Sequence, residues 1–242
     1  MKAIILAAGR GSRMGGLTDT QPKGLVSLRG KPLLEWQLAS LRAAGIHEIA
    51  LVTGYRHEAL SPYGLPMFHN PDWRRTNMVT SLACAREWLQ AEACIVSYSD
   101  IFYEANAVRK LMDSDAALAL TYDPDWLRLW QARFDCPLSD AETFRVSDGG
   151  RLLEIGSKPS SVEEVQGQYM GLLRFTPAGW AMLERLRASL DDSERDSLHM
   201  TGAIQRALAL DALPIAAIPY TGKWGEVDSA SDLALYESLA LP

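Results

Sequence analysis

Glycines and basic side chains gather near the amino end of this 242-residue chain. The apolar run Ala3-Ile4-Ile5-Leu6-Ala7-Ala8 is followed directly by Gly9-Arg10-Gly11-Ser12-Arg13, and Lys23 comes shortly afterwards. Glycines allow a backbone to turn sharply and to approach a ligand closely, because they carry no Cβ atom. Backbone N–H groups in such a turn bind anions, and Arg10, Arg13 and Lys23 add positive charge. The pattern predicts a loop that holds a polyphosphate.

Two better-known glycine motifs do not fit this stretch. The Walker phosphate-binding loop requires GxxxxGK[ST], a string that the chain lacks. The dinucleotide fingerprint GxGxxG matches at Gly9 and Gly11 but has Met14 in its last position. We therefore expect neither of these binding modes.

The stretch LAAGRGSRMGGLTDTQPKGLVSLRGKPLLEW, which begins at Leu6, has a longer match. It resembles the signature of the nucleotidyltransferases that activate sugar phosphates and alcohol phosphates with a nucleoside triphosphate. In that family LAAGxGxRM is followed by PK and then by GKPLL. Gly16 departs from the pattern, because many relatives have proline before Leu17-Thr18. The resemblance implies an α/β, Rossmann-like fold of the nucleotide-diphospho-sugar transferase type, with a mostly parallel mixed sheet and helices on both faces.

The resemblance also implies roles for individual residues. It assigns Lys23 to the α-phosphate and the attacking oxygen, and Arg13 to the β- and γ-phosphates. It pairs Asp100 with Asp228, in the segment Glu226-Val227-Asp228-Ser229, as ligands of one Mg²⁺ ion. Relatives often carry a second acid in the central motif, whereas Ser-Tyr-Ser-Asp-Ile-Phe holds only Asp100. The expected nucleotide-binding residues are Leu6, Ala7, Ala8, Gly9, Gly11, Ser12, Arg13, Lys23, Asn77 and Ser81.

Asn77 and Ser81 belong to this set on a weaker pattern. They match the Asn-x-x-x-Ser of choline-phosphate relatives and are expected to touch the base or the acceptor. Capping of a helix that begins at Met78 explains Asn77 nearly as well.

The charges of the reactants define the chemistry. A phosphate or phosphonate oxygen of the acceptor attacks the α-phosphorus of the triphosphate, and pyrophosphate leaves. The second pKa of a phosphate monoester is about 6, so this oxygen is anionic near neutral pH and needs no general base. Two like unit charges 4 Å apart repel by about 4 kcal/mol at an effective dielectric of 20. We therefore expect Arg13, Lys23 and Mg²⁺ to neutralise the reactants and the leaving group.

Aromatic residues and acids in the second half of the chain suggest the acceptor. Aromatic faces attract an alkylammonium group by about 0.5–2 kcal/mol per ring, and a carboxylate supplies the counter-charge. This composition favours an acceptor with an alkylammonium group. The chain also resembles bacterial cytidylyltransferases, and this resemblance implies CTP as the nucleotide and phosphocholine, phosphoethanolamine or 2-aminoethylphosphonate as the acceptor. The alternative for Trp126 and Trp130, four residues apart, is one packing face of a helix. The expected acceptor-binding residues are Asp123, Trp126, Trp130, Tyr169, Trp224 and Glu226.

Hydrophobic periodicity predicts the elements that position these residues. Buried parallel strands that end in glycine or aspartate put their following loops at one edge of a sheet. Strands are expected at residues 3–8, 48–54, 66–70, 93–99, 117–122 and 168–175. Helices are expected at residues 32–45, 78–89, 105–113, 177–190, 201–210 and 230–239. A turn is expected at residues 147–150 and a solvated acidic loop at residues 191–196.

Length and composition define the class of protein. We expect one nucleotidyltransferase domain over residues 1–242, with a nucleotide-binding half (1–122) and an acceptor-binding half (123–242) that contains an insertion (123–171). A formal net charge of −6 argues against nucleic-acid binding. Three cysteines without a CxxC pair argue against disulfides or a zinc site, and no apolar run is long enough for a membrane span or a signal peptide. A cytoplasmic protein is therefore expected.

Other interpretations stay open. A hexose-1-phosphate nucleotidyltransferase that uses UTP, dTTP or GTP fits the same signature, and a non-catalytic nucleotide-binding regulator would keep the same fold. Retention of Arg13, Lys23, Asp100 and Asp228 together argues against the regulator. The four histidines lack metal-binding spacings, although His199 is placed where it could border the acceptor. A homodimer is neither predicted nor excluded.

Overall fold

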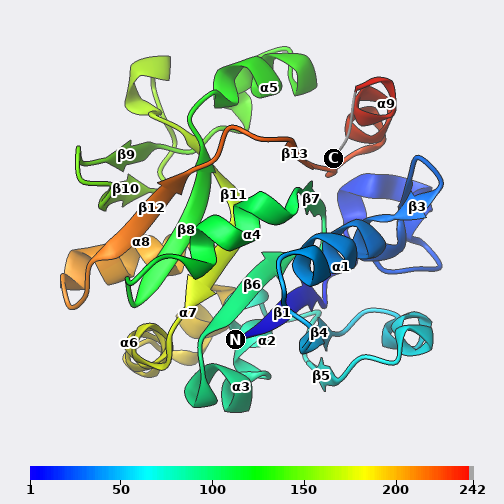
Figure 1. Cartoon of the computed structure of the whole chain (residues 1–242), viewed down its shortest axis with the longest axis horizontal. Helices are drawn as coiled ribbons and strands as arrows, with labels where there is room; N and C mark the ends of the chain where they lie inside the picture. The colour runs from blue at the N-terminus through cyan, green and yellow to red at the C-terminus, as the bar shows by residue number, and fades with distance from the viewer. Residues whose placement is uncertain (240–242) are drawn as a thin grey trace.

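A seven-stranded sheet runs through the middle of the computed structural model, which describes residues 1–239 (Figure 1). Its strand order is β12-β8-β11-β6-β1-β4-β5. Every pair is parallel except those of β11, which is antiparallel to both β6 and β8. Its strands are β1 (Lys2–Ala7), β4 (Ile49–Thr53), β5 (Met67–His69), β6 (Cys94–Tyr98), β8 (Leu118–Asp123), β11 (Gln168–Phe175) and β12 (Ile215–Pro219). This is the mostly parallel mixed sheet that the resemblance implies.

Helices cover both faces of the sheet, and α1 and α4 pass in front of it in Figure 1. The helices are α1 (Leu33–Ala43), α2 (Met78–Ala83), α3 (Arg86–Ala91), α4 (Ala105–Met112), α5 (Trp126–Arg133), α6 (Pro177–Ala188), α7 (Asp192–Ser197), α8 (Met200–Leu210) and α9 (Ala230–Ser238). Shorter strands form three two-stranded ribbons: β2 (Ser27–Leu28) with β3 (Lys31–Pro32), β9 (Phe144–Val146) with β10 (Leu152–Ile155), and β7 (Ile101–Tyr103) with β13 (Trp224–Glu226).

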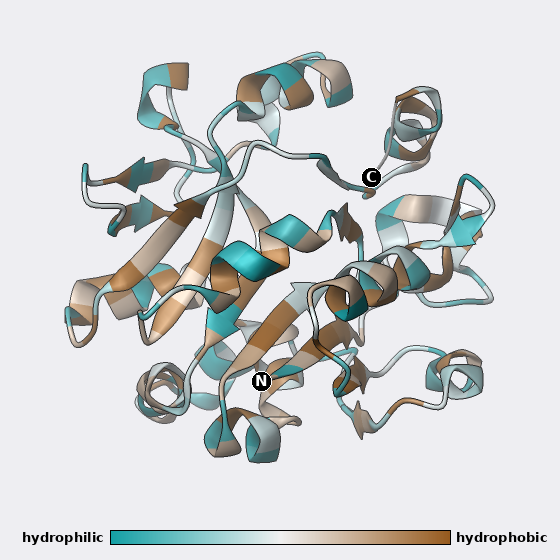
Figure 2. Cartoon of the chain, viewed as in Figure 1, coloured by the Kyte–Doolittle hydropathy of each residue, from teal (hydrophilic) through white to brown (hydrophobic). Residues whose placement is uncertain are grey.

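The core follows the alternation of side chains along the central strands. On β1, Ile4 and Leu6 pack under α2, α3, α6 and α8, whereas Ile5 and Ala7 pack under α1 and α4. Figure 2 shows hydrophobic residues along the central strands and mixed hydropathy on the helices that cover them. Because both faces are covered, the central strands are nearly continuous apolar runs, which is why the sequence pattern predicts them. No helix within residues 1–239 combines the length and hydrophobicity that a membrane span needs.

Four expectations about local structure need correction. The helix expected at residues 78–89 is two helices, α2 and α3, because the backbone at Ala85 leaves the helical region. The acidic segment expected as a loop contains α7, whose first turn is capped when the Asp191 carboxylate accepts a hydrogen bond from the Glu194 amide. Helix α5 lies in the segment expected as an insertion, where a helix was considered only as the alternative for Trp126 and Trp130, and the β7–β13 ribbon was not predicted. The last two matter most, because both build the site.

Candidate active site

The register of the sheet brings the glycine loop beside Asp100. Strands β1 and β6 are parallel neighbours with Leu6 opposite Tyr98, so both end at the same edge. The loop that starts at Ala8 follows β1, and Asp100 comes two residues after the end of β6. The carboxyl ends of parallel strands are the usual ligand-binding edge of an open α/β sheet.

The β7–β13 ribbon brings the second acidic segment to the same place. Glu226 lies opposite Ile101 in this antiparallel pair, and the Val227 amide donates a hydrogen bond of 2.9 Å to the Asp100 carbonyl. Asp100, Glu226 and Asp228 each contribute a carboxylate oxygen to a cluster whose atoms lie within 4.8 Å of one another. We call these three residues the acidic trio. Glu226, which we expected at the acceptor, therefore also belongs to the acidic cluster.

Basic side chains surround the acidic trio. Lys23 is 7% exposed, and its ammonium donates a hydrogen bond of 2.8 Å to Asp100 Oδ2 and also binds Asp228 Oδ1. Arg13 lies 3.0 Å from the same Asp228 oxygen, but most of its side chain faces solvent. Burial alone lowers the pKa of Lys23, but the carboxylates of Asp100 and Asp228 more than reverse this and raise it. Lys23 is therefore a permanent cation at the centre of the site.

The donors of the acidic trio fit a hard divalent cation such as Mg²⁺, which prefers carboxylate oxygens. Asp100 Oδ1 is buried and has no hydrogen-bond partner, which is unusual for a carboxylate oxygen unless another ligand binds it. Burial raises the pKa of Glu226 to about 8, and the charges of Asp228 and Asp100 act in the same direction. The raised pKa reflects buried carboxyl groups that lie close together, and a bound cation would favour their ionised forms.

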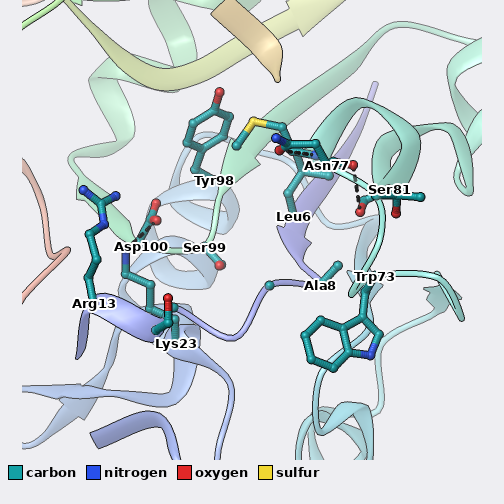
Figure 3. A pocket seen from close by; sticks show the side chains of 15 residues that line it. Leu6, Ala8, Arg13, Lys23, Trp73, Asn77, Ser81, Tyr98, Ser99 and Asp100 are labelled. Carbon is teal, nitrogen blue, oxygen red and sulfur yellow. Dashed lines mark hydrogen bonds and ion pairs between the residues drawn. The ribbon is translucent and has the colours of Figure 1, made fainter. Parts of the chain in front are cut away.

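A first pocket extends from this charged cluster along the loop (Figure 3). Arg13, Lys23 and Asp100 lie at one end, and Ala8, Trp73 and Ser81 lie at the other. Of the ten expected nucleotide-binding residues, Ala7 alone does not line it, because its side chain points to the opposite face of β1. The lining residues that the sequence did not indicate are Trp73, Thr76, Met78, Tyr98 and Ser99. The pocket has one charged end and one neutral end, as a nucleoside triphosphate does.

Two glycines are required by the shape of this pocket. Gly11 has φ +72°, and a Cβ atom there would lie 2.8 Å from the Lys23 side chain. A Cβ atom at Gly54 would lie 2.7 Å from the Ala8 carbonyl and 2.6 Å from the Trp73 Cβ atom. Gly11 therefore allows Lys23 to cross beneath the loop, and Gly54 allows the indole of Trp73 to close the neutral end.

Asn77 and Ser81 line the pocket but also hold the surrounding structure together. The Asn77 side-chain oxygen accepts a hydrogen bond of 2.7 Å from the Met78 amide, and its amide group donates to the Ser197 carbonyl. The Ser81 hydroxyl accepts a hydrogen bond of 2.9 Å from Asn70. The helix-capping interpretation of Asn77 therefore holds, and it is compatible with contact to a ligand.

A second pocket adjoins the first and shares Arg13, Met78 and Tyr98 with it. Glu226 and Asp228 line its inner part. Its wall also carries Asp140, Glu142, Gln168, Tyr169, His199 and Thr201. Asp140 and Glu142 are carboxylates outside the acidic trio, and no sequence pattern pointed to them. Burial raises the pKa of Glu142, whose carboxylate accepts a hydrogen bond of 3.2 Å from the Thr201 hydroxyl.

Two tryptophans expected at the acceptor, Trp126 and Trp224, lie in the core instead. Trp126 and Trp224 line neither of these two pockets, and the Trp126 indole donates a hydrogen bond of 3.0 Å to the Val165 carbonyl. The Asp123 carboxylate accepts hydrogen bonds from the Trp224 indole at 2.9 Å and from the Asp125 amide at 2.7 Å. Trp126 contacts Trp130 edge-to-face and Trp224 contacts it at a tilt, so these rings are part of the core under α5. The packing-face alternative is therefore correct for this helix.

Three of the six expected acceptor residues do line the second pocket. Trp130 reaches it with an edge, since only 3% of the residue is exposed, and Tyr169 and Glu226 lie in its wall. His199 borders the same pocket and caps α8, because its Nδ1 atom accepts a hydrogen bond of 3.1 Å from the Gly202 amide.

Comparison with known proteins places this geometry in a class. Residues 3–207 match the family described as the MobA-like NTP transferase domain. The chain therefore belongs to this family and is a nucleotidyltransferase. It is similar to a CTP:phosphoglutamine cytidylyltransferase of Campylobacter jejuni, with 36% identity over 96% of this chain and 98% of the relative.

Two solved structures share the fold. One is an inositol-1-phosphate CTP transferase from T. maritima, with a TM-score of 0.75, 19% identity, and 100% of this chain and 97% of that chain covered. The other is a CTP:phosphocholine cytidylyltransferase from Streptococcus pneumoniae, with a TM-score of 0.72, 21% identity, and 98% and 97% covered. At these identities the likeness concerns the fold, which agrees with the sheet and helices described above.

Proposed function

We propose that this chain is a Mg²⁺-dependent cytidylyltransferase that transfers CMP from CTP to a small phosphate or phosphonate carrying an amine. The observation that carries the proposal is the pair of carboxylates, Asp140 and Glu142, in a pocket that also contains Arg13 and Asp228. Such a pocket suits an acceptor with an anionic group at one end and a cationic group at the other. The similar protein from Campylobacter jejuni, named for phosphoglutamine, supports both the nucleotide and the acceptor class.

In this proposal the first pocket holds CTP. The triphosphate lies at the end with Lys23 and Arg13, and the cytosine lies at the neutral end against Trp73. Stacking of a base on an aromatic ring contributes about 1–3 kcal/mol without strong base preference. Thr76, Asn77 and Ser81 are the polar side chains at that end that could distinguish the bases.

The acceptor enters from the second pocket, with its phosphate towards Arg13 and Lys23. Mg²⁺ held by the acidic trio would neutralise charge on the phosphates. The Lys23 ammonium contacts both Asp100 and Asp228, and we expect it to turn towards the α-phosphate when CTP binds. Holding two polyanions together against their repulsion is the main task of these residues, because the attacking oxygen is already ionised.

A matrix of nucleotides against acceptors tests the proposal by pyrophosphate release. CTP, UTP and dTTP would each be combined with phosphocholine, phosphoethanolamine, 2-aminoethylphosphonate, phosphoglutamine and glucose-1-phosphate. We expect turnover with CTP and at least one amine, and none after removal of Mg²⁺ with EDTA. The variant Asp228→Ala is the matched inactive control, since it should lose kcat far more than CTP affinity. Turnover only with glucose-1-phosphate and UTP or dTTP would refute the acceptor assignment and support the hexose-1-phosphate alternative.

A further inference from the structure

Arg133, the last residue of α5, lies buried against the acidic segment. Its side chain has 0% exposure, and its Nε atom donates a hydrogen bond of 2.9 Å to Asp232 Oδ1. Its Nη1 atom donates a hydrogen bond of 3.2 Å to Glu226 Oε2, and its Nη2 atom lies 3.7 Å from Asp228 Oδ2. The guanidinium also lies 5.1 Å from the centroid of the Trp130 ring. One cation thus contacts two members of the acidic trio.

The two carboxylate oxygens of Asp228 contact different basic groups. Oδ2 lies towards Arg133, inside the protein. Oδ1 binds Lys23 and lies 3.0 Å from Arg13, at the edge of the pockets. Since a planar guanidinium offers several donors in a fixed geometry, it restricts the rotation of a carboxylate more than a lysine ammonium does. The ion pair with Arg133 therefore favours the orientation in which Asp228 Oδ1 faces the pockets.

Asp232 extends the same arrangement to the backbone. Its Oδ2 atom accepts hydrogen bonds of 3.0 Å from the Asp228 amide and 3.0 Å from the Ser229 amide. The Ser229 hydroxyl in turn accepts a hydrogen bond from the Asp232 amide, which completes a capping box at the start of α9. The Arg133–Asp232 pair therefore holds both the backbone and the side chain of Asp228.

We propose that Arg133 is a positioning residue that, together with Asp232, sets the carboxylates of Glu226 and Asp228 for a divalent cation. The inference rests on the metal site of the proposed function. Groups that orient metal ligands from behind commonly change metal affinity or activity about 10- to 100-fold when they are altered. Arg133 also keeps a cluster of buried acids electrically balanced, which buried carboxylates require.

The sharpest test is Mn²⁺ binding, followed by electron paramagnetic resonance, in the Arg133→Lys variant. Lysine keeps the charge but loses the paired donors to Asp232 and Glu226. We expect Mn²⁺ affinity to fall about tenfold or more. Since this assay uses neither CTP nor an acceptor, its outcome does not depend on the substrates assigned above.

Matched variants separate positioning from folding. Arg174→Lys is the control, because Arg174 donates a hydrogen bond of 2.8 Å to the Ala116 carbonyl, away from the acidic trio. It should lower Tm without changing Mn²⁺ affinity. Asp232→Asn keeps Arg133 and should also weaken Mn²⁺ binding. This variant tests the proposal if Arg133→Lys fails to fold. Wild-type Mn²⁺ affinity in a folded Arg133→Lys or Asp232→Asn protein would overturn the inference, as would absence of Mn²⁺ binding in the wild type.

Discussion

Lys23 occupies the centre of the acidic trio, so replacing it with methionine should separate stability from catalysis. The Lys23→Met variant keeps an apolar stem of similar length and removes the ammonium. Asp100 then loses the 2.8 Å hydrogen bond to one oxygen, while its other oxygen already has no hydrogen-bond partner. Asp228 keeps its contacts with Arg13 at 3.0 Å and Arg133 at 3.7 Å. The variant therefore leaves mainly Asp100 without a counter-charge.

The magnitude follows from the burial of the pair. Breaking a buried ion pair by removing one partner costs about 3–5 kcal/mol of unfolding free energy. Because Asp228 keeps other partners, we expect the lower value, about 3 kcal/mol, which corresponds to a Tm about 6–12 °C lower for a chain of this size. Mg²⁺ would supply the missing positive charge, and a ligand at 100 times its Kd stabilises a protein by about 2.7 kcal/mol. Mg²⁺ should thus restore most of the stability.

Thermal unfolding of wild type and Lys23→Met, each in EDTA and in Mg²⁺, measures these effects. We expect a larger Mg²⁺-dependent rise in Tm for the variant than for the wild type. Turnover, measured as pyrophosphate release, should stay at least 100-fold below wild type in Mg²⁺, because the cation at the α-phosphate is missing (about 2.7 kcal/mol at 1.36 kcal/mol per tenfold change). Equal Tm values in EDTA, or recovery of kcat by Mg²⁺ alone, would refute this account of Lys23.

Three further substitutions test the assignment of the pockets. Trp73→Ala should raise the KM for CTP about tenfold and change kcat little, because one base-stacking contact of about 1–3 kcal/mol is lost; steady-state kinetics with CTP varied would show this. Glu142→Gln should raise the KM of the amine-bearing acceptor about tenfold without altering the KM of CTP, since only the counter-charge of the amine is removed; an equal change in both constants would contradict its place in the acceptor pocket. Trp126→Phe should lower Tm, because the indole loses its 3.0 Å hydrogen bond to Val165, and should leave the acceptor KM unchanged. A changed acceptor KM would indicate that Trp126 contributes to acceptor binding.

Most of what could be predicted from the sequence came from patterns of residues that are close together along the chain. The apolar run before Gly9 and the run before Asp100 predict neighbouring buried strands, because a strand covered on both faces must be apolar throughout. The expected phosphate end is built from Gly11, Arg13 and Lys23, which lie close together along the chain. Because their spacing along the chain is local, it can be recognised in the sequence as part of the nucleotidyltransferase signature.

Only the tertiary structure decided which distant residues meet. The three-residue strands β7 and β13 form a ribbon in which Glu226 lies opposite Ile101. This pairing, rather than any sequence spacing, brings Glu226 and Asp228 beside Asp100. Strands of three residues show too little hydrophobic periodicity to be recognised in a sequence. Which strands pair depends on the packing of the whole sheet. The Asp100–Asp228 pairing was therefore expected from resemblance alone, and the part of Glu226 in the acidic trio was not predicted.

Aromatic side chains also show that residue type alone does not determine which residues form a site. Trp126 and Trp224 have the chemistry of a cation-binding cage, but in the fold they pack against Trp130 within the core. Asp140 and Glu142 belong to no motif and reach the second pocket because the chain folds back there. Residue type determines which interactions a side chain can make, whereas burial and long-range contacts determine which interactions it does make.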